Sequence, residues 1–298
     1  MSWKVMNVPS RSRSVRRAAA VAMAVVLVFS GTAHAAEQLP QSHLYTPSHN
    51  GQVDVGESVV ISGGGYYGMN ADTLQDYQVS VDGGATWASG QRTGTIPLGG
   101  ETGIAQALWK YVFTPQEPGV YTIVSRVNTD TLFGQVSAPR TLYVGVPAPA
   151  PGACFGCSFF THDPSYFEAE NLRVELGLRF RVDRPGIVVR VVTSWHYREA
   201  SRVRLWRGDG TLLADQAVTG DWAQPFATPV PVVPGEEYVA SFTSYRGHYR
   251  ITENAFPATV VQAPFVLPAH AGVYTYGDGF PSQTWNDSHY WVSPEFQS

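Results

Sequence analysis

The chain has 298 residues, of which 44% are hydrophobic and 15% are charged, and its formal net charge is −4. This acidic balance, without a block of lysines or arginines in the body of the chain, excludes the basic surface that nucleic-acid binding requires. The length suits two domains, and the Gly, Pro, Val, Thr and Tyr content without a long helical period predicts an all-β protein.

The first 35 residues have the pattern of a secretory signal. A basic segment ending at Arg17 precedes an apolar run of 12 residues from Ala18 to Phe29, and Ala33-His34-Ala35 is a small-x-small cleavage pattern. The apolar run is shorter than the about 20 residues that a membrane-spanning helix needs. We therefore predict cleavage after Ala35 and a secreted or periplasmic protein with no membrane span. The mature chain keeps 15 basic and 24 acidic residues, a formal net charge of −9.

From about Leu44 to Gly145 the sequence predicts a series of short strands separated by turns. Trp109, Tyr111 and Phe113 lie two residues apart, so we expect the three rings on one face of a strand. Further strands are predicted at residues 58–61, 77–81 and 120–127.

Gly63-Gly64-Gly65-Tyr66-Tyr67-Gly68 follows one of these strands and has the spacing of a dinucleotide-binding loop. That motif needs the N-terminus of a helix to hold the pyrophosphate, and the next residues begin no strand–helix–strand unit. We therefore expect a flexible aromatic loop here and no nucleotide cofactor.

Three groups of residues in this half carry a resemblance: Val79 to Gly84 with Trp87, then Trp109, then Gly119-x-Tyr121-x-Ile123 with Arg126 and Gly134-Gln135. The third group has the spacing of the tyrosine corner of immunoglobulin-like sandwiches. Over roughly residues 53–144 the chain resembles the immunoglobulin-like C-terminal domain of sulfite-oxidase-type molybdenum enzymes. In that family the domain serves dimerisation and packing, so the resemblance implies a sandwich and a surface for a homodimer, and no molybdenum site.

Val146-Pro147-Ala148-Pro149-Ala150-Pro151-Gly152 alternates proline with alanine, and such a segment favours extended polyproline II. We place a linker at residues 147–153, between an immunoglobulin-like domain at 36–146 and a second domain at 154–298. Cys154-Phe155-Gly156-Cys157 opens the second domain. Because the chain is predicted to be exported, we expect a small disulfide between Cys154 and Cys157 in preference to a redox or metal pair.

The clearest strand of the chain lies at 174–182, where Leu176, Leu178 and Phe180 alternate with other side chains, as in a strand with one buried face. A hairpin is predicted at 203–214, with its turn at Gly208-Asp209-Gly210. With strands at 187–192 and 238–242 and two more within 273–296, the second domain has about eight strands. That number predicts a jelly-roll-like β-sandwich.

Motifs along nearly all of this half carry a second resemblance. They include Cys154 to Phe159, Val174 to Arg181, Leu205-Trp206, Gly210 to Ala214, Pro234 to Ser241, Gly247-His248-Tyr249, Val273 to Gly277, Phe280-Pro281 and Tyr290-Trp291-Val292. The half resembles the bacterial secreted domain-of-unknown-function family four-zero-eight-two. That family occurs in exported proteins beside immunoglobulin-like and carbohydrate-active modules, and the resemblance implies no established chemistry.

Aromatic side chains are the main indication of a ligand. Sugars present flat C–H faces that stack on exposed Trp and Tyr, and a few polar groups fix their orientation. The candidate rings are Trp195, Tyr197, Trp222, Tyr245, Tyr249, Trp285 and Tyr290. Two segments interleave rings with polar groups and predict the ligand-binding residues Tyr245, His248, Tyr249, Trp285, Asn286 and His289.

Three functions stay open at this point. We prefer a secreted non-catalytic binding module for carbohydrate or cell-wall polymer. The alternatives are a structural or assembly protein with dimer contacts through the first domain, and a glycan-active hydrolase or lyase that uses two acids such as Glu168 and Glu170. The sequence has no Gly-x-Ser-x-Gly or His-Glu-x-x-His motif, so no catalytic residue is predicted. No cofactor is expected, and a structural Ca²⁺ near Asp163, Glu168 or Asp278 is left open.

Overall fold

The computed structural model describes residues 38–68, 71–97, 105–193, 200–218 and 225–298. Within these ranges the chain is all-β, with one short 3-10 helix, η1 (Ala71–Thr73), which confirms the predicted fold class. Gln38–Ser298 forms one compact unit. The predicted signal peptide at 1–35 lies outside the described residues. None of the helices in the described part of the chain is long and apolar enough to cross a membrane.

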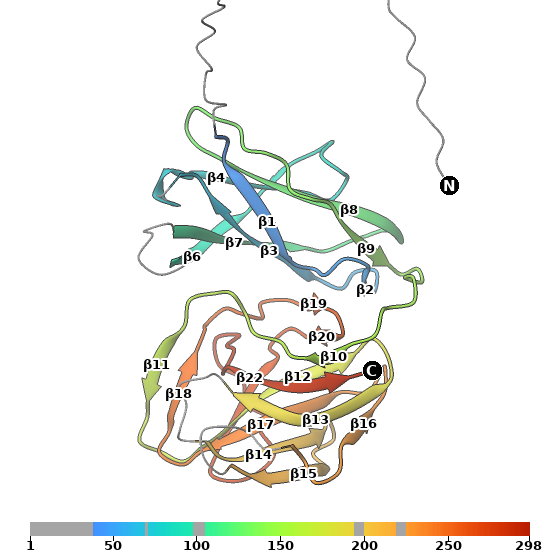
Figure 1. The fold of residues 1–298 in the computed structure, drawn as a ribbon, viewed down its shortest axis with the longest axis vertical. Coiled ribbons are helices and arrows are strands. Elements are labelled where there is room, and N and C mark those ends of the chain that lie inside the picture. Colours follow the sequence, from blue (N-terminus) through green and yellow to red (C-terminus); the bar gives the residue numbers. More distant parts are fainter. Residues whose placement is uncertain (1–37, 69–70, 98–104, 194–199, 219–224) are drawn as a thin grey trace, which may run out of the picture. The chain divides into compact units, whose positions relative to one another are not determined.

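The first half folds into two sheets (Figure 1). One sheet has the order β1 (Gln41–Thr46), β3 (Val59–Tyr66), β7 (Ala105–Phe113) and β6 (Gln91–Pro97). The other has the order β2 (Gly51–Val53), β9 (Arg140–Val144), β8 (Gly119–Asn128), β4 (Asp76–Ser80) and β5 (Ala88–Ser89). The β2–β9 pair is parallel, and the other pairs of these two sheets are antiparallel.

Side chains from both sheets form one apolar core in this half. Trp109 is 1% exposed in this core, and Tyr111 and Phe113 pack against it. The prediction that these three rings share a face is therefore confirmed. Tyr121 donates a hydrogen bond from its hydroxyl to the backbone oxygen of Glu117 (2.9 Å). This is the contact that a tyrosine corner makes.

The triple glycine does not form the flexible loop that we expected. Gly63, Gly64 and Gly65 lie inside β3 and pair with both β1 and β7. A Cβ atom on Gly63 would come within 2.5 Å of the Trp109 ring, and one on Gly65 within 2.7 Å of Val127. The glycines are therefore explained by large side chains that pack directly onto the strand backbone.

The second half is a sandwich of a four-stranded and a seven-stranded sheet, with a small two-stranded sheet beside them. The four-stranded sheet has the order β10 (Phe155–Cys157), β22 (Val292–Gln297), β13 (Gly186–Thr193) and β16 (Val230–Val232). The larger sheet has the order β15 (Leu212–Ala217), β14 (Ala200–Arg207), β17 (Tyr238–Ser244), β12 (Val174–Val182), β20 (Phe265–Leu267) and β19 (Val260–Gln262), and β21 (Gly272–Tyr276) also pairs with β12. The small sheet pairs β11 (Tyr166–Ala169) with β18 (His248–Ile251).

The predicted inward residues of β12 are confirmed. Leu176, Leu178 and Phe180 are at most 1% exposed and share one core with Val188 and Phe296 of the opposite sheet. The predicted hairpin is also present, as β14 and β15.

The prediction that β12 buries only one face is wrong at Glu175 and Gly177, which are buried as well. The reason is the segment after β21, which crosses that outer face. A Cβ atom on Gly177 would lie 3.1 Å from Pro281, and the Phe280 ring lies 5.8 Å from the Trp206 ring.

The two sandwiches contact each other directly as well as through residues 147–153, which belong to no strand. Val60 belongs to the core of the second sandwich, and Val261 belongs to the core of the first. Lys110, the only lysine after residue 4, is buried where its ammonium lies 2.5 Å from the Asp163 carboxylate. Buried contacts of this kind join the two sandwiches into one compact unit.

Cys154 and Cys157 form a disulfide, as predicted. Replacing both with serine is expected to lower the free energy of unfolding by about 2 kcal/mol, because closing even a short loop restricts the unfolded chain. Urea unfolding of the double variant beside the oxidised parent measures this difference. The parent in reductant serves as the control and is expected to match the variant. Equal stability of all three samples would contradict a stabilising role for the bond.

Candidate functional site

A cleft of about 340 Å³ opens in the second sandwich. Its lining comes from the β11–β18 sheet, from β21 and from the segment between β21 and β22. Six of the lining side chains are aromatic and three are carboxylates: Tyr166, Tyr249, Tyr274, Tyr276, Tyr290 and Trp285, with Glu168, Glu170 and Glu253, together with Ile251.

The pairing of β11 with β18 brings four of these ten residues together. Tyr166 lies opposite Ile251, and Glu168 lies opposite Tyr249. Residues that are opposite each other in an antiparallel pair point to the same face, so these side chains all reach the cleft. The intervening Arg250 points the other way, where it donates a hydrogen bond to Ser165 and lies 5.8 Å from the Trp291 ring.

Tyrosines form the floor of the cleft. The ring of Tyr290 lies 5.8 Å from that of Tyr249 and 6.5 Å from that of Tyr274, with each pair in an edge-to-face arrangement. Tyr249 and Tyr290 are 4% and 2% exposed, so they are fixed parts of the interior. This packing makes the floor rigid.

Three rings at the rim stay open to solvent. Tyr166, Tyr276 and Trp285 are 47%, 52% and 55% exposed. Large aromatic side chains are costly to expose unless another surface covers them in function. The rim is therefore the part of the cleft best suited to contact a ligand.

The carboxylates are tied to the phenols. The Glu170 carboxylate accepts a hydrogen bond from the Tyr249 hydroxyl, and its proximity raises the pKa of Tyr276. Glu253 accepts one from the Tyr166 hydroxyl (2.9 Å) and one from the Asn286 side-chain amide (3.3 Å). The Oε2 atom of Glu170 is buried, and among the described residues it has no hydrogen-bond partner.

These surroundings keep the phenols protonated. Burial, and then the hydrogen bond to Glu170, raise the pKa of Tyr249, and burial also raises the pKa of Tyr290. Burial and then Glu253 raise the pKa of Tyr166 to about 12. The hydroxyls are thus donors at every pH at which the protein is expected to work, and none supplies a phenolate base.

The segment that carries Trp285 is held by several local contacts. Asn286 and Asp287 have φ angles of 42° and 50°, a left-handed conformation that Asn and Asp tolerate best among residues with a side chain. The Asn286 backbone oxygen accepts a hydrogen bond from the Asn254 backbone N–H (2.8 Å), and the Asp287 carboxylate contacts the His270 ring. These contacts fix the backbone on which the Trp285 ring is presented.

With the geometry of the cleft established, the family of this half can be considered. Residues 161–292 match the model of a domain of unknown function, DUF4082. This supports the relationship expected from the motifs of the second half, and every residue of the cleft lies within the DUF4082 region. The resemblance of the first half to sulfite-oxidase-type enzymes stays a prediction.

Comparison with curated proteins found no match. One similar solved structure is described as "Structural basis for the promiscuous specificity of the carbohydrate-binding modules from the beta-sandwich super family"; the identity is 10% over 81% of this chain and 99% of that chain, with a TM-score of 0.21. Another is SGBP-B of the mixed-linkage glucan utilization locus of Bacteroides ovatus in complex with a mixed-linkage heptasaccharide; the identity is 13% over 66% of this chain and 50% of that chain, with a TM-score of 0.20. With TM-scores this low, we draw no conclusion from either similarity.

Of the six ligand-binding residues predicted from the sequence, three lie at the cleft. Tyr249 and Trp285 line it, and Asn286 contacts one of its carboxylates. Tyr245 is exposed elsewhere, with Arg173 5.7 Å from its ring, and does not line the cleft.

The remaining two predicted residues, His248 and His289, lie away from the cleft. His248 is paired with Ala169 on the other face of the small sheet, against Phe167. His289 is fully buried among aromatic rings, a position that keeps it from any ligand at the surface. The candidate rings Trp195, Tyr197 and Trp222 lie outside the described residues.

Sequence reasoning missed five cleft residues: Tyr166, Ile251, Glu253, Tyr274 and Tyr276. A signal for some of them was present, because Tyr166-x-Glu168-x-Glu170 and Tyr274-x-Tyr276 both have the two-residue period of a strand face. Their meeting in one cleft depends on the pairing of β11 with β18, which joins segments about 80 residues apart.

The three acids considered for a calcium ion lie at different places. Asp163 pairs with Lys110, Asp278 lies 2.7 Å from the Arg173 guanidinium, and Glu168 lines the cleft. In the described part of the chain, no group of three or more His, Cys, Asp or Glu side chains is arranged to hold a metal ion.

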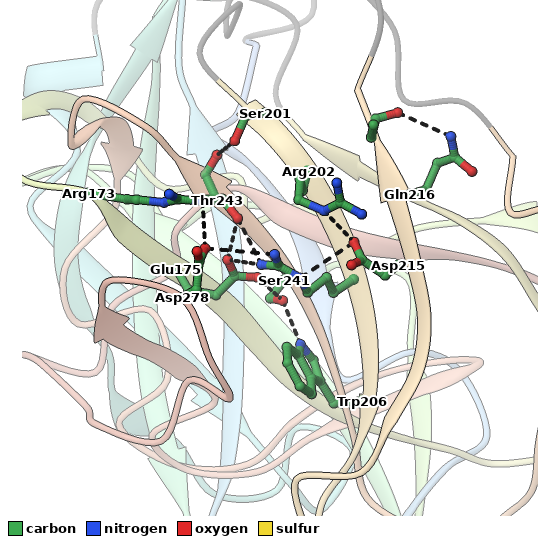
Figure 2. Close-up of polar contacts among 12 residues, drawn as sticks. Arg173, Glu175, Ser201, Arg202, Trp206, Asp215, Gln216, Ser241, Thr243 and Asp278 are labelled. Carbon is green, nitrogen blue, oxygen red and sulfur yellow. Dashed lines mark hydrogen bonds and ion pairs between the residues drawn. The ribbon is translucent and has the colours of Figure 1, made fainter.

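A second polar cluster lies on the outer face of the seven-stranded sheet (Figure 2). Glu175 is fully buried and accepts hydrogen bonds from Arg204 (2.6 Å), Ser241 (2.6 Å) and Thr243 (2.5 Å). Burial raises the pKa of Glu175, and these donors act in the opposite direction. Because the segment after β21 covers this cluster, we assign it a role in folding.

Proposed function

We propose that this protein is a secreted, non-catalytic module that binds carbohydrate in the cleft of the DUF4082 region. The observation that carries the proposal is the half-exposed rim of Tyr166, Tyr276 and Trp285 around a cleft that is lined by three carboxylates. The apolar faces of a sugar ring stack on such side chains, and its hydroxyls need acceptors beside them.

The cleft offers those acceptors in fixed positions. The carboxylates of Glu170 and Glu253 are oriented by tyrosine hydroxyls, and those tyrosines are held by strands or by ring packing. A site that is already ordered loses little side-chain entropy on binding, so more of the contact energy appears as affinity.

The same hydrogen bonds support a binding role over hydrolysis. A glycosidase needs a carboxylic acid that gives its proton to the glycosidic oxygen. In this cleft Glu170 and Glu253 both accept hydrogen bonds from phenols, an arrangement that favours them as acceptors over proton donors. Glycan release by the mature protein, measured as new reducing ends, would contradict this part of the proposal.

Replacing Trp285 with alanine tests the proposal. The variant is expected to lose about tenfold or more in affinity for the polysaccharides that retain the parent, because it loses the stacking surface of the most exposed ring at the rim. The measurement is depletion of the mature protein from solution by a panel of insoluble polysaccharides, followed by titration with soluble oligosaccharides of those that bind.

Tyr245→Ala is the matched control. Tyr245 is 64% exposed, as open as Trp285, but it does not line the cleft, so its loss is expected to leave retention unchanged. Retention of the parent by no polysaccharide, or equal losses in the two variants, would refute a saccharide site in this cleft.

A further inference from the structure

The proposed saccharide cleft carries an unbalanced charge. Three glutamates line it, and no lysine, arginine or histidine is among its described lining residues. The nearest cation of the β11–β18 sheet in sequence, Arg250, is directed to the opposite face by the register. A ligand that enters the cleft therefore meets negative charge that no neighbouring side chain in the lining neutralises.

Two of the hydrogen-bond donors in the cleft are already in use. The Tyr166 hydroxyl donates to Glu253, and the Tyr249 hydroxyl donates to Glu170. The raised pKa values of these tyrosines keep them in the donor form. The carboxylates offer a ligand lone pairs, which accept hydrogen bonds and donate none.

One of those carboxylates also has an unused acceptor. The Oε2 atom of Glu170 is buried and has no partner among the described residues, although a buried polar atom normally has a hydrogen-bond partner. It lies on a residue of the cleft wall, next to the aromatic floor. A small positively charged donor would satisfy both the acceptor and the charge.

The aromatic rim favours the same chemistry. The faces of Trp and Tyr rings attract a cation within about 6 Å of the ring centre, and the attraction grows when the pair is removed from water. Tyr276 and Trp285 present such faces beside the carboxylates. A ligand with carboxylate or phosphate groups would meet repulsion from the glutamates of this cleft.

We propose that the cleft selects glycans that carry protonated primary amines, such as polymers of deacetylated hexosamine. The inference rests on the proposed function and narrows its ligand class. The sugar ring stacks on the rim, and its ammonium group bonds to the carboxylates of Glu170 and Glu253. Neutral sugars with the same backbone keep the stacking contact and the hydroxyl hydrogen bonds but lack this charge-assisted bond.

Three hexasaccharides with the same β-1,4 backbone test this selectivity, because they differ only in the group at carbon 2: a hydroxyl, an acetamide or a free amine. Calorimetric titration of the mature chain is expected to give an affinity for the amine form about tenfold higher than for the acetamide form at low salt. The ratio is expected to shrink at high salt, since exposed charge pairs are screened.

Glu253→Gln separates charge from shape. The amide keeps an oxygen that can accept a hydrogen bond from Tyr166, so the variant is expected to keep its affinity for the acetamide form. Because the negative charge is gone, it is expected to lose most of the amine preference. Glu117→Gln removes the same charge from an exposed site in the first sandwich and is expected to change neither value.

The outcomes distinguish the two proposals. Equal or tighter binding of the neutral or acetamide form, or an amine preference that Glu253→Gln leaves intact, overturns the amine selectivity and leaves saccharide binding standing. Binding of none of the three hexasaccharides, together with no retention on the polysaccharide panel, overturns both.

Discussion

Replacing Arg204 with methionine is expected to lower the free energy of unfolding by about 3 kcal/mol or more, because it leaves the Glu175 carboxylate buried without its cation. Glu175 is 0% exposed, and the Arg204 side chain is 8% exposed. Ser241 and Thr243 still donate to the carboxylate in the variant, so they limit the loss without removing it. Urea unfolding monitored by tryptophan fluorescence measures the change.

The pH dependence of this loss follows from the pKa of Glu175. Burial already raises that pKa in the parent, and removing Arg204 removes one of the groups that lower it. A carboxyl group with a raised folded pKa costs stability above that pKa, and the cost disappears as the pH falls and the group is protonated. The variant is therefore expected to approach the stability of the parent as the solution becomes more acidic.

Two further variants control for the effect of burial. Arg202 pairs with Asp215 at 2.7 Å but is 39% exposed, so Arg202→Met is expected to cost less than about 1 kcal/mol. Combining Glu175→Leu with Arg204→Met removes both charges and is expected to recover much of the stability. If Arg204→Met proves no more costly than Arg202→Met, the cluster in Figure 2 does not make the stabilising contribution assigned to it.

The sequence predicted the strands and their inward faces where hydrophobic residues alternate over a long stretch. Leu176, Leu178 and Phe180 are the clearest case, because a two-residue period leaves only one way to bury all three side chains. The local sequence did not predict the surroundings of Gly63–Gly65 or of Glu175. In both places the surroundings come from distant segments: Trp109 packs onto the glycines, and the chain around Phe280 covers the outer face of β12.

Only half of the predicted ligand-binding residues lie at the cleft, because contacts with distant segments again decide which side chains are accessible. Trp285 and Asn286 lie in a segment rich in polar and turn-forming residues, and such segments are usually on the surface. His289, three residues beyond Asn286, follows the same local pattern but turns into the core, because its backbone pairs with Thr252. Local composition therefore identified the segment, and long-range pairing decided which of its side chains are accessible.

The buried position of His289 predicts a loss of stability in mild acid. Rings of Phe159 and Phe256 lie 5.5 Å from its imidazole, and its Nδ1 atom has no partner among the described residues. Burial lowers the pKa of His289 to about 4, from the ordinary 6.5; Val292 and Asp163 act in the opposite direction.

A histidine whose folded pKa is lowered binds a proton more readily in the unfolded chain. The stability it contributes is complete above pH 6.5 and is lost as the pH falls from 6.5 towards 4. The shift corresponds to about 3 kcal/mol over that range. Urea unfolding at several pH values is expected to show this slope in the parent.

His289→Gln cannot take up a proton, so the variant is expected to lose the greater part of the slope whatever its stability at neutral pH. His43→Gln changes an exposed histidine and is expected to keep the slope of the parent. Burial also lowers the pKa of His162, so this histidine is expected to contribute part of the slope that remains in His289→Gln. Identical slopes in the parent and His289→Gln would show that the imidazole is not held neutral in the core.

Because Tyr290 of the cleft floor follows His289 directly, glycan binding is expected to weaken over the same pH range in the parent and less so in the variant.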